Sequence, residues 1–219
     1  MQVSRVRRPK SVAQSAYNRM SHFYDWLAGS SETRLIHQGI ELLAVSPGES
    51  VLEVGCGTGK ALVEFCRQAG DQAVVFGLDL SSGMLQVASS RLLKNYLRRS
   101  INLLEGDGQA LPLQSCIFSA IFMSFTLELF DTPEIPQVLS ECQRVLKPGG
   151  RLVVVAMSMP NQSSWIVRLY EWFHTHFPAY VDCRPINAQA MIQAAGFSIE
   201  KQLEESMWGL PVILIRATR

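Results

Sequence analysis

A run of seven residues, from Glu53 to Gly59, holds the pattern in this sequence that is best suited to binding a ligand. It reads G-x-G-x-G, with Gly55, Gly57 and Gly59 directly after an apolar run and before a helical stretch. Glycine lets the backbone turn tightly and approach a ligand closely, and the N-terminus of the following helix presents free N–H groups. A loop that binds the diphosphate of a dinucleotide would need a further glycine where this chain has Lys60. The spacing therefore disfavours a nicotinamide dinucleotide.

An acidic residue, Asp79, ends the next apolar run. A carboxylate at the end of a strand can accept two hydrogen bonds from the diol of a ribose. Asp79 could instead cap the helix that begins at Ser81 and Ser82, and both roles can hold together. Its pairing with the glycine run favours the role in binding a nucleoside.

Apolar runs that alternate with helical stretches predict how these residues are held in place. Five strands and three intervening helices are expected: strands at 51–54, 74–78, 101–104, 117–122 and 151–156, and helices at 60–69, 81–97 and 132–146. Such alternation is typical of βαβ units and a mostly parallel sheet. Two further runs, 197–204 and 212–217, are joined by a short turn near Gly209, which forces antiparallel pairing. The predicted fold class is α/β: a doubly wound, mostly parallel seven-stranded sheet that ends in an antiparallel hairpin.

Four segments resemble, in order, the motifs of class I S-adenosylmethionine-dependent methyltransferases: 51–59, 77–85, 106–113 and 145–152. The resemblance implies a Rossmann-like fold, S-adenosyl-L-methionine as the cofactor, and transfer of its methyl group. It also implies that Asp107 accepts a hydrogen bond from the adenine amino group, while the backbone of Gly108 contacts the ring. The residues expected to bind the cofactor are Tyr24, Glu53, Gly55, Cys56, Gly57, Gly59, Asp79, Leu80, Met84, Asp107, Gly108 and Ser124.

Within this family the chain is most similar to the C-methyltransferases of ubiquinone and menaquinone biosynthesis. The similarity rests on Tyr24-Asp25, Ser124-Phe125 and the aromatic stretch 168–178. The chain departs from that group at 126–130, where the group has a polar stretch with glycine, and at Gly108, where it has alanine. Three functions therefore remain open: methylation of a lipophilic quinone precursor, N-methylation of the ethanolamine head group of a phospholipid, and a catalytically idle cofactor-binding partner subunit.

Two aromatic regions could enclose a lipophilic acceptor. The first is an N-terminal helical roof at 13–45, where Tyr17 or Tyr24 could face the sulfonium of the cofactor or could simply pack. The second is an inserted lid at 158–185, whose aromatic residues could equally belong to the core. A phenolic acceptor needs a general base. The candidates are His22, Glu128, His174 and His176, which the sequence does not rank.

Composition is consistent with one globular domain over the 219 residues. The net charge of +1 gives no general attraction for nucleic acid. The basic start, 1–12, is expected to be a flexible tail, with a foothold on an anionic membrane as the alternative. Five cysteines without a C-x-x-C pair predict reduced thiols and a cytoplasmic protein, and no metal site is expected. The sequence makes no prediction of the oligomeric state.

Overall fold

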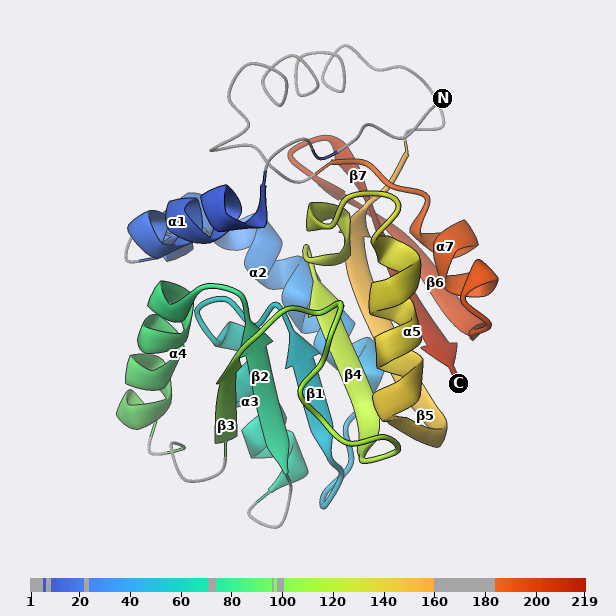
Figure 1. Ribbon diagram of the computed structural model, residues 1–219, viewed down its shortest axis with the longest axis horizontal. Helices are drawn as coiled ribbons and strands as arrows, with labels where there is room; N and C mark the ends of the chain where they lie inside the picture. Colours follow the sequence, from blue (N-terminus) through green and yellow to red (C-terminus); the bar gives the residue numbers. More distant parts are fainter. Residues whose placement is uncertain are drawn as a thin grey trace.

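The computed structural model describes residues 6, 9–21, 24–70, 74–95, 97, 101–159 and 184–219, with 24–30 described for the backbone alone. Its centre is a seven-stranded sheet in the order β3-β2-β1-β4-β5-β7-β6 (Figure 1). The strands are β1 (Val51–Val54), β2 (Val75–Asp79), β3 (Ile101–Glu105), β4 (Phe118–Ser124), β5 (Leu146–Met157), β6 (Ser198–Met207) and β7 (Leu210–Thr218). The pairs among β1 to β5 are parallel, whereas β7 runs antiparallel to both β5 and β6. The predicted fold class is confirmed.

The strand order reverses between β1 and β4, which pair in parallel in the middle of the sheet. In open α/β sheets a crevice forms outside the carboxyl ends of the strands at such a switch point, and ligands bind there. The topology therefore places Gly55, after β1, and Ser124, at the end of β4, on the same edge of the sheet.

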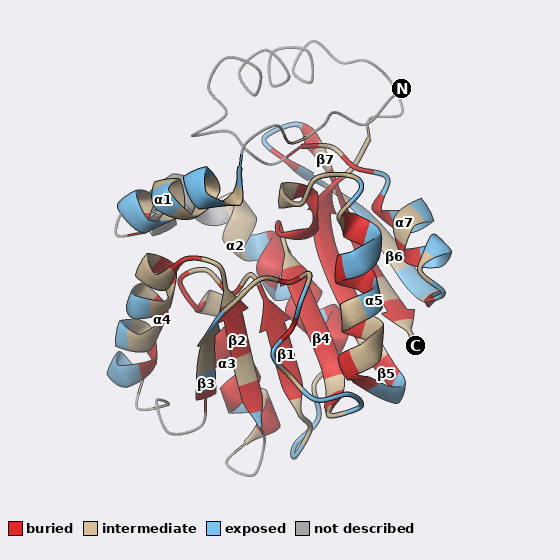
Figure 2. Cartoon of the chain, viewed as in Figure 1, coloured by how far each residue is buried: buried red, intermediate tan, exposed pale blue. Residues whose placement is uncertain are grey.

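Helices cover both faces of the sheet, which is why the central strands are buried along their length (Figure 2). On one face the core contains residues of α2 (Tyr24–Leu43), α3 (Lys60–Ala69) and α4 (Ser82–Lys94). On the other face it contains residues of α5 (Ile135–Val145) and α7 (Ala188–Ala194). The approach of α2 is close, because a Cβ added to Gly39 would lie 2.7 Å from Val155 Cγ2.

The N-terminal region differs from its prediction at its start. The expected tail at 1–12 is too long, because α1 (Lys10–Met20) already begins after Pro9. Within the stretch 13–45, which was expected to form a helical roof, α1 contacts α4, and α2 packs against β4 and β5. Of these two helices, α1 lies at the edge where β1 to β4 end (Figure 1).

Helix boundaries elsewhere also depart from the predictions. The helix expected from Thr132 begins at Ile135, because the Asp131 carbonyl accepts from the Glu134 N–H and forms a turn first. β5 begins at Leu146, so the Lys147–Gly150 segment that was expected to separate helix and strand is part of the strand. α7 and the 3-10 helix η2 (Leu127–Leu129) were not predicted. The lid expected at 158–185 lies almost wholly outside the described residues.

The described residues also bear on the thiols and on membrane-spanning helices. The four cysteines in the described part, Cys56, Cys66, Cys116 and Cys142, are free thiols. No helix among the described residues combines the length and the apolar character needed to cross a membrane.

Candidate functional site

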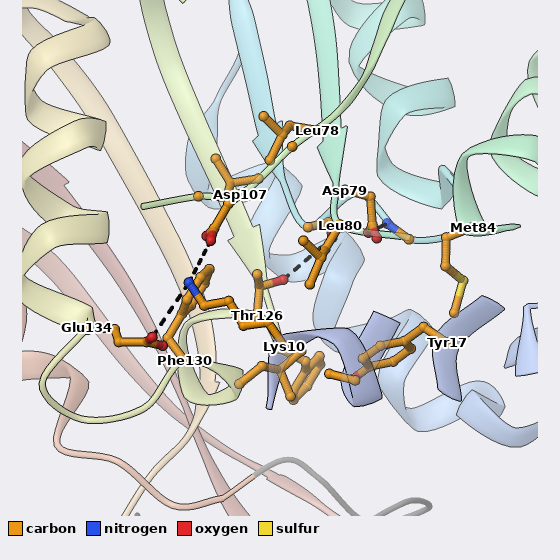
Figure 3. A pocket seen from close by; sticks show the side chains of 18 of the residues that line it. Lys10, Tyr17, Leu78, Asp79, Leu80, Met84, Asp107, Thr126, Phe130 and Glu134 are labelled. Atoms are coloured by element: carbon orange, nitrogen blue, oxygen red, sulfur yellow. Dashed lines mark hydrogen bonds and ion pairs between the residues drawn. The ribbon is translucent and has the colours of Figure 1, made fainter. Parts of the chain in front are cut away.

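A cavity of about 280 Å³ opens at the carboxyl ends of the central strands (Figure 3). Four loops and one helix line it: the loop after β1, the β2–α4 connection, the loop after β3, the segment after β4, and α1. Eight of the twelve residues expected to bind the cofactor line this cavity: Gly55, Gly57, Asp79, Leu80, Met84, Asp107, Gly108 and Ser124. The topology thus brings together residues that are far apart in the sequence.

The three glycines of the loop after β1 serve different purposes. All have positive φ, at 72°, 49° and 75° for Gly55, Gly57 and Gly59. A Cβ at Gly55 would lie 2.4 Å from the Thr126 side chain, and one at Gly59 would lie 2.9 Å from Ala88 Cβ. A Cβ at Gly57 would meet no atom within 4 Å. Gly55 and Gly59 therefore permit close packing, whereas Gly57 leaves the surface of the cavity open to a ligand.

Asp79 is oriented by backbone N–H groups at the cavity. Its Oδ2 accepts from Gly57 N at 2.8 Å, and its Oδ1 accepts from Ser81 N at 2.8 Å. Burial raises the pKa of Asp79, and these hydrogen bonds oppose the shift. The helix cap is Ser81, whose Oγ accepts from Met84 N, so Asp79 supports the turn before α4 and does not cap the helix itself.

Glu53 lies beneath the glycine loop and is 2% exposed. Burial raises the pKa of Glu53 well above its usual value, and the nearby charge of Asp79 raises it further, while a hydrogen bond from the backbone of Leu62 in α3 opposes the shift. Its Oε2 has no hydrogen-bond partner among the residues that the structure describes. Glu53 is therefore a buried carboxyl group with one oxygen still able to accept a hydrogen bond.

The burial of Glu53 should make the free energy of unfolding depend on pH. The pKa of Glu53 is higher in the folded state than in the unfolded state, so folding takes up a proton. The contribution of Glu53 to the free energy of unfolding therefore falls as the pH rises above about 4.5, by up to ~1.4 kcal/mol per pH unit. The Glu53→Gln variant lacks this titrating group, so its free energy of unfolding should rise with pH relative to that of wild type. Glu49→Gln is the opposite control, because Arg151 lowers the pKa of Glu49 and stabilises its ionised form. Urea unfolding between pH 4 and 8 measures both; parallel curves for wild type and Glu53→Gln would contradict the assignment.

The loop after β3 holds Asp107 between two donors. Its Oδ1 accepts from Gln109 N at 3.0 Å, and its Oδ2 accepts from the Lys10 ammonium group at 2.5 Å. The Nζ of Lys10 also lies 3.5 Å from Glu134 Oε1 (Figure 3). The carboxylate expected to recognise adenine is therefore linked directly to α1.

The absence of a side chain at Gly108 has a steric cause. A Cβ there would lie 2.9 Å from Phe130 Cζ and 3.3 Å from Val54 Cγ1. Phe130 belongs to the 126–130 segment in which this chain departs from the quinone methyltransferases. The two departures noted in the sequence are thus in contact, and glycine at 108 accommodates phenylalanine at 130.

We expect Gly108→Ala to lower the free energy of unfolding by about 1–3 kcal/mol, because it overpacks this contact. In a Phe130→Leu background the same change should cost clearly less, since the clashing ring atom is gone. Urea denaturation of the two single variants and the double variant measures the coupling. Equal costs in both backgrounds would show that Phe130 is not what excludes a side chain at 108.

The remaining predicted residues lie elsewhere. Cys56, Gly59 and Glu53 are outside the cavity lining, and the Cys56 side chain is buried. Glu128 is fully buried outside the lining, where its Oε1 accepts from Met157 N at 3.1 Å. The side chain of Tyr24 and all of His22, His174 and His176 fall outside the described residues. Their assigned roles stay predictions.

Sequence reasoning missed several residues that line the cavity: Lys10, Ala13, Thr126, Leu129, Phe130 and Glu134. Tyr17, one of the two aromatic candidates of the N-terminal roof, also lines it. Among the residues that the structure describes, no group of three or more His, Cys, Asp or Glu side chains could hold a metal ion.

Residues 51–150 match the family model described as a methyltransferase domain. These residues include the glycine loop, Asp79, Asp107 and Ser124. The segment that holds the predicted cofactor-binding loops therefore resembles a methyltransferase domain. This match agrees with the resemblance seen in the sequence motifs.

Curated relatives support the same class. The chain is 37% identical over 114 residues to the demethylmenaquinone methyltransferase of Lactococcus lactis, covering 52% of this chain and 44% of that protein. It is 30% identical over 152 residues to the 2-phytyl-1,4-naphtoquinone methyltransferase of Nostoc punctiforme, covering 68% of this chain and 65% of that protein. The match to the ubiquinone/menaquinone biosynthesis C-methyltransferase of Teredinibacter turnerae is 34% over 134 residues, covering 61% and 53%. The aligned part of the chain thus spans between 44% and 65% of the length of these relatives.

Solved structures share the fold. A SAM-dependent methyltransferase from Aquifex aeolicus superposes with a TM-score of 0.68 at 20% identity, covering 90% of this chain and 97% of that one. The [4+2]-cyclase SpnF superposes with a TM-score of 0.76 at 18% identity, covering 99% and 98%. Because a cyclase shares the architecture, the fold alone does not determine the reaction.

Proposed function

We propose that this chain binds S-adenosylmethionine in the cavity at the carboxyl ends of β1, β2 and β4 and transfers its methyl group to a lipophilic quinone precursor. One observation carries the proposal: the glycine loop, Asp79 and Asp107 line a single cavity at the switch point of the sheet. The residues fit the cofactor, because Gly57 leaves open space and two carboxylates, Asp79 and Asp107, reach the lining. The free Oε2 of Glu53 beneath the loop offers a further buried acceptor.

Each group has a distinct part in this proposal. Asp79 accepts hydrogen bonds from the ribose hydroxyls, and Asp107 accepts from the adenine amino group. Leu80, Met84 and Phe130 supply apolar surface around the base. The bound cofactor supplies a methyl group that its sulfonium already activates, so the chain chiefly provides position and a dry environment. Tyr17 lies on the lining and offers an aromatic ring to a positive charge.

Two observations support a lipophilic methyl acceptor. Apolar side chains contribute much of the lining: Val6, Pro9, Ala13, Val54, Leu78, Leu80, Met84, Phe125, Leu129 and Phe130. Such surface suits a lipophilic molecule with few polar groups. The relatives from Lactococcus and Nostoc are named for demethylmenaquinone and for a phytyl naphthoquinone.

Methyl transfer to a panel of acceptors tests the proposal. The full chain is incubated with methyl-labelled S-adenosylmethionine and a demethylated naphthoquinol, a demethylated benzoquinol, or phosphatidylethanolamine in detergent. We expect label in a quinol, with turnover that rises with the length of its isoprenoid chain. Label in phosphatidylethanolamine alone would instead support N-methylation of a phospholipid. Cofactor binding without any turnover would point to an idle partner subunit.

A further inference from the structure

α1 is attached to the rest of the protein mainly through polar side chains. Lys10, Gln14 and Asn18 are spaced four residues apart and therefore share one face of the helix. Gln14 Nε2 donates to the Leu80 carbonyl at 2.8 Å and to Glu105 Oε1 at 3.1 Å. Together with the Lys10–Asp107 ion pair, this face contacts the loops that follow β2 and β3.

Asn18 joins the helix to the start of α4. Its Oδ1 accepts from Ser81 Oγ at 2.6 Å and from Gly83 N at 2.9 Å. The two backbones also approach closely here, since a Cβ at Gly83 would lie 2.9 Å from Asn18 Cα. The contact thus needs both the Asn18 amide and the missing side chain of Gly83.

Apolar burial adds little to this attachment. No residue of α1 is buried, whereas α3 buries six of its residues. Figure 2 shows the same contrast between α1 and the sheet. Polar contacts that remain partly exposed stabilise less than apolar burial and weaken in salt. α1 is therefore the described element at the cavity that can detach at the smallest cost.

Because α1 lines the cavity, its detachment would change access to the cavity. Pro9, Lys10, Ala13 and Tyr17 line the cavity from this side. Lys10 extends from the helix to the carboxylate of Asp107, with Glu134 as a second partner (Figure 3). A ligand held by Asp79 and Asp107 would lie under this helix.

We propose that α1 covers the cofactor cavity and is held closed by a latch of three polar residues, Lys10, Gln14 and Asn18. This latch controls how fast the cofactor enters and leaves. The inference rests on the proposed cofactor site. In the closed state Lys10 binds Asp107, Gln14 binds Leu80 and Glu105, and Asn18 binds Ser81 and Gly83. Exchange of the cofactor requires all three contacts to open, so weakening any one of them speeds entry and departure alike.

Two variants loosen the cover at opposite ends. Lys10→Met removes the ion pair while keeping an unbranched apolar stem. Gly83→Ala removes no polar group, but its Cβ pushes Asn18 away, and alanine is otherwise favourable in a helix. Arg19→Met is the matched control, because it removes a positive charge from an exposed position on the same helix.

Association and dissociation rates of labelled S-adenosylmethionine test the proposal on the full chain. For Lys10→Met and Gly83→Ala we expect both rate constants to rise by about fivefold or more, with the dissociation constant changed much less. Raising potassium chloride from about 50 to about 500 mM should speed exchange in wild type and much less in Lys10→Met, because salt screens the ion pair. Arg19→Met should match wild type.

The outcomes separate the two proposals. Wild type that binds the cofactor, with both loosened variants exchanging it at wild-type rates, would overturn the latch and leave the cofactor site intact. A rise in dissociation alone would also overturn it, because that marks a simple binding contact. Failure of wild type to bind S-adenosylmethionine would overturn the cofactor site and the latch together.

Discussion

Gly57→Val should lower the affinity for S-adenosylmethionine by at least about 100-fold, or roughly 3 kcal/mol. The branched side chain would project where the structure leaves more than 4 Å of free space at the cavity, and it would displace the ligand from the loop. The positive φ of 49° adds a strain of about 1–2 kcal/mol for a residue with a Cβ. Isothermal titration measures the affinity, and thermal unfolding measures the strain.

A matched variant separates strain from lost binding. Gly48 also has a positive φ, of 82°, and also has nothing within 4 Å of an added Cβ, but it lies in the turn before β1, at the opposite edge of the sheet. Gly48→Val should therefore show a similar loss of stability with unchanged cofactor affinity. Equal affinities for the two variants would mean that the ligand does not approach Gly57.

Asp79→Ala should weaken cofactor binding by about 1.5–3 kcal/mol, or about 10- to 150-fold, as expected for hydrogen bonds to a charged group. The change removes the acceptor for the ribose and also leaves the N–H groups of Gly57 and Ser81 without their partner. Asp79→Asn tests the charge more gently, because it keeps the shape of the side chain. Isothermal titration at pH 7.5 gives the affinities.

The pH dependence of binding provides a second measurement on Asp79. Burial raises the pKa of Asp79, so its carboxylate takes up a proton at a higher pH than a free aspartate would. Affinity should therefore fall on acidification in wild type and change less in Asp79→Asn. Glu49→Ala is a control at the other edge of the sheet, since that carboxylate also accepts a backbone N–H, from Ser46. A loss in Glu49→Ala equal to that in Asp79→Ala would remove Asp79 from the site.

The sequence predicted those parts of the fold that depend on local pattern. Short apolar runs bounded by turns located the strands, and the short turn at Gly209 predicted the antiparallel hairpin, which the structure confirms. The glycine loop and Asp79 were recognisable because their chemistry depends on residue type next to a strand end. The predicted start of α5 was too early, because Thr132-Pro133 has the pattern of a cap and a first helical residue but forms a turn.

Contacts between distant segments could not be predicted in this way. Lys10 meets Asp107 across 97 positions of the chain, and the basic start had been assigned to a tail by its charge alone. The exclusion of a side chain at Gly108 depends on Phe130, which follows a different strand. The one local signal was the spacing of Lys10, Gln14 and Asn18, a polar stripe whose partners only the fold supplies.

Titration of the full wild-type chain with S-adenosylmethionine and with NADH tests the central claim most directly. The account predicts saturable heat with S-adenosylmethionine that Gly57→Val abolishes and Gly48→Val preserves, and no heat of binding with NADH. Binding of NADH, or S-adenosylmethionine binding that survives in Gly57→Val, would contradict the assignment of this cavity to the cofactor.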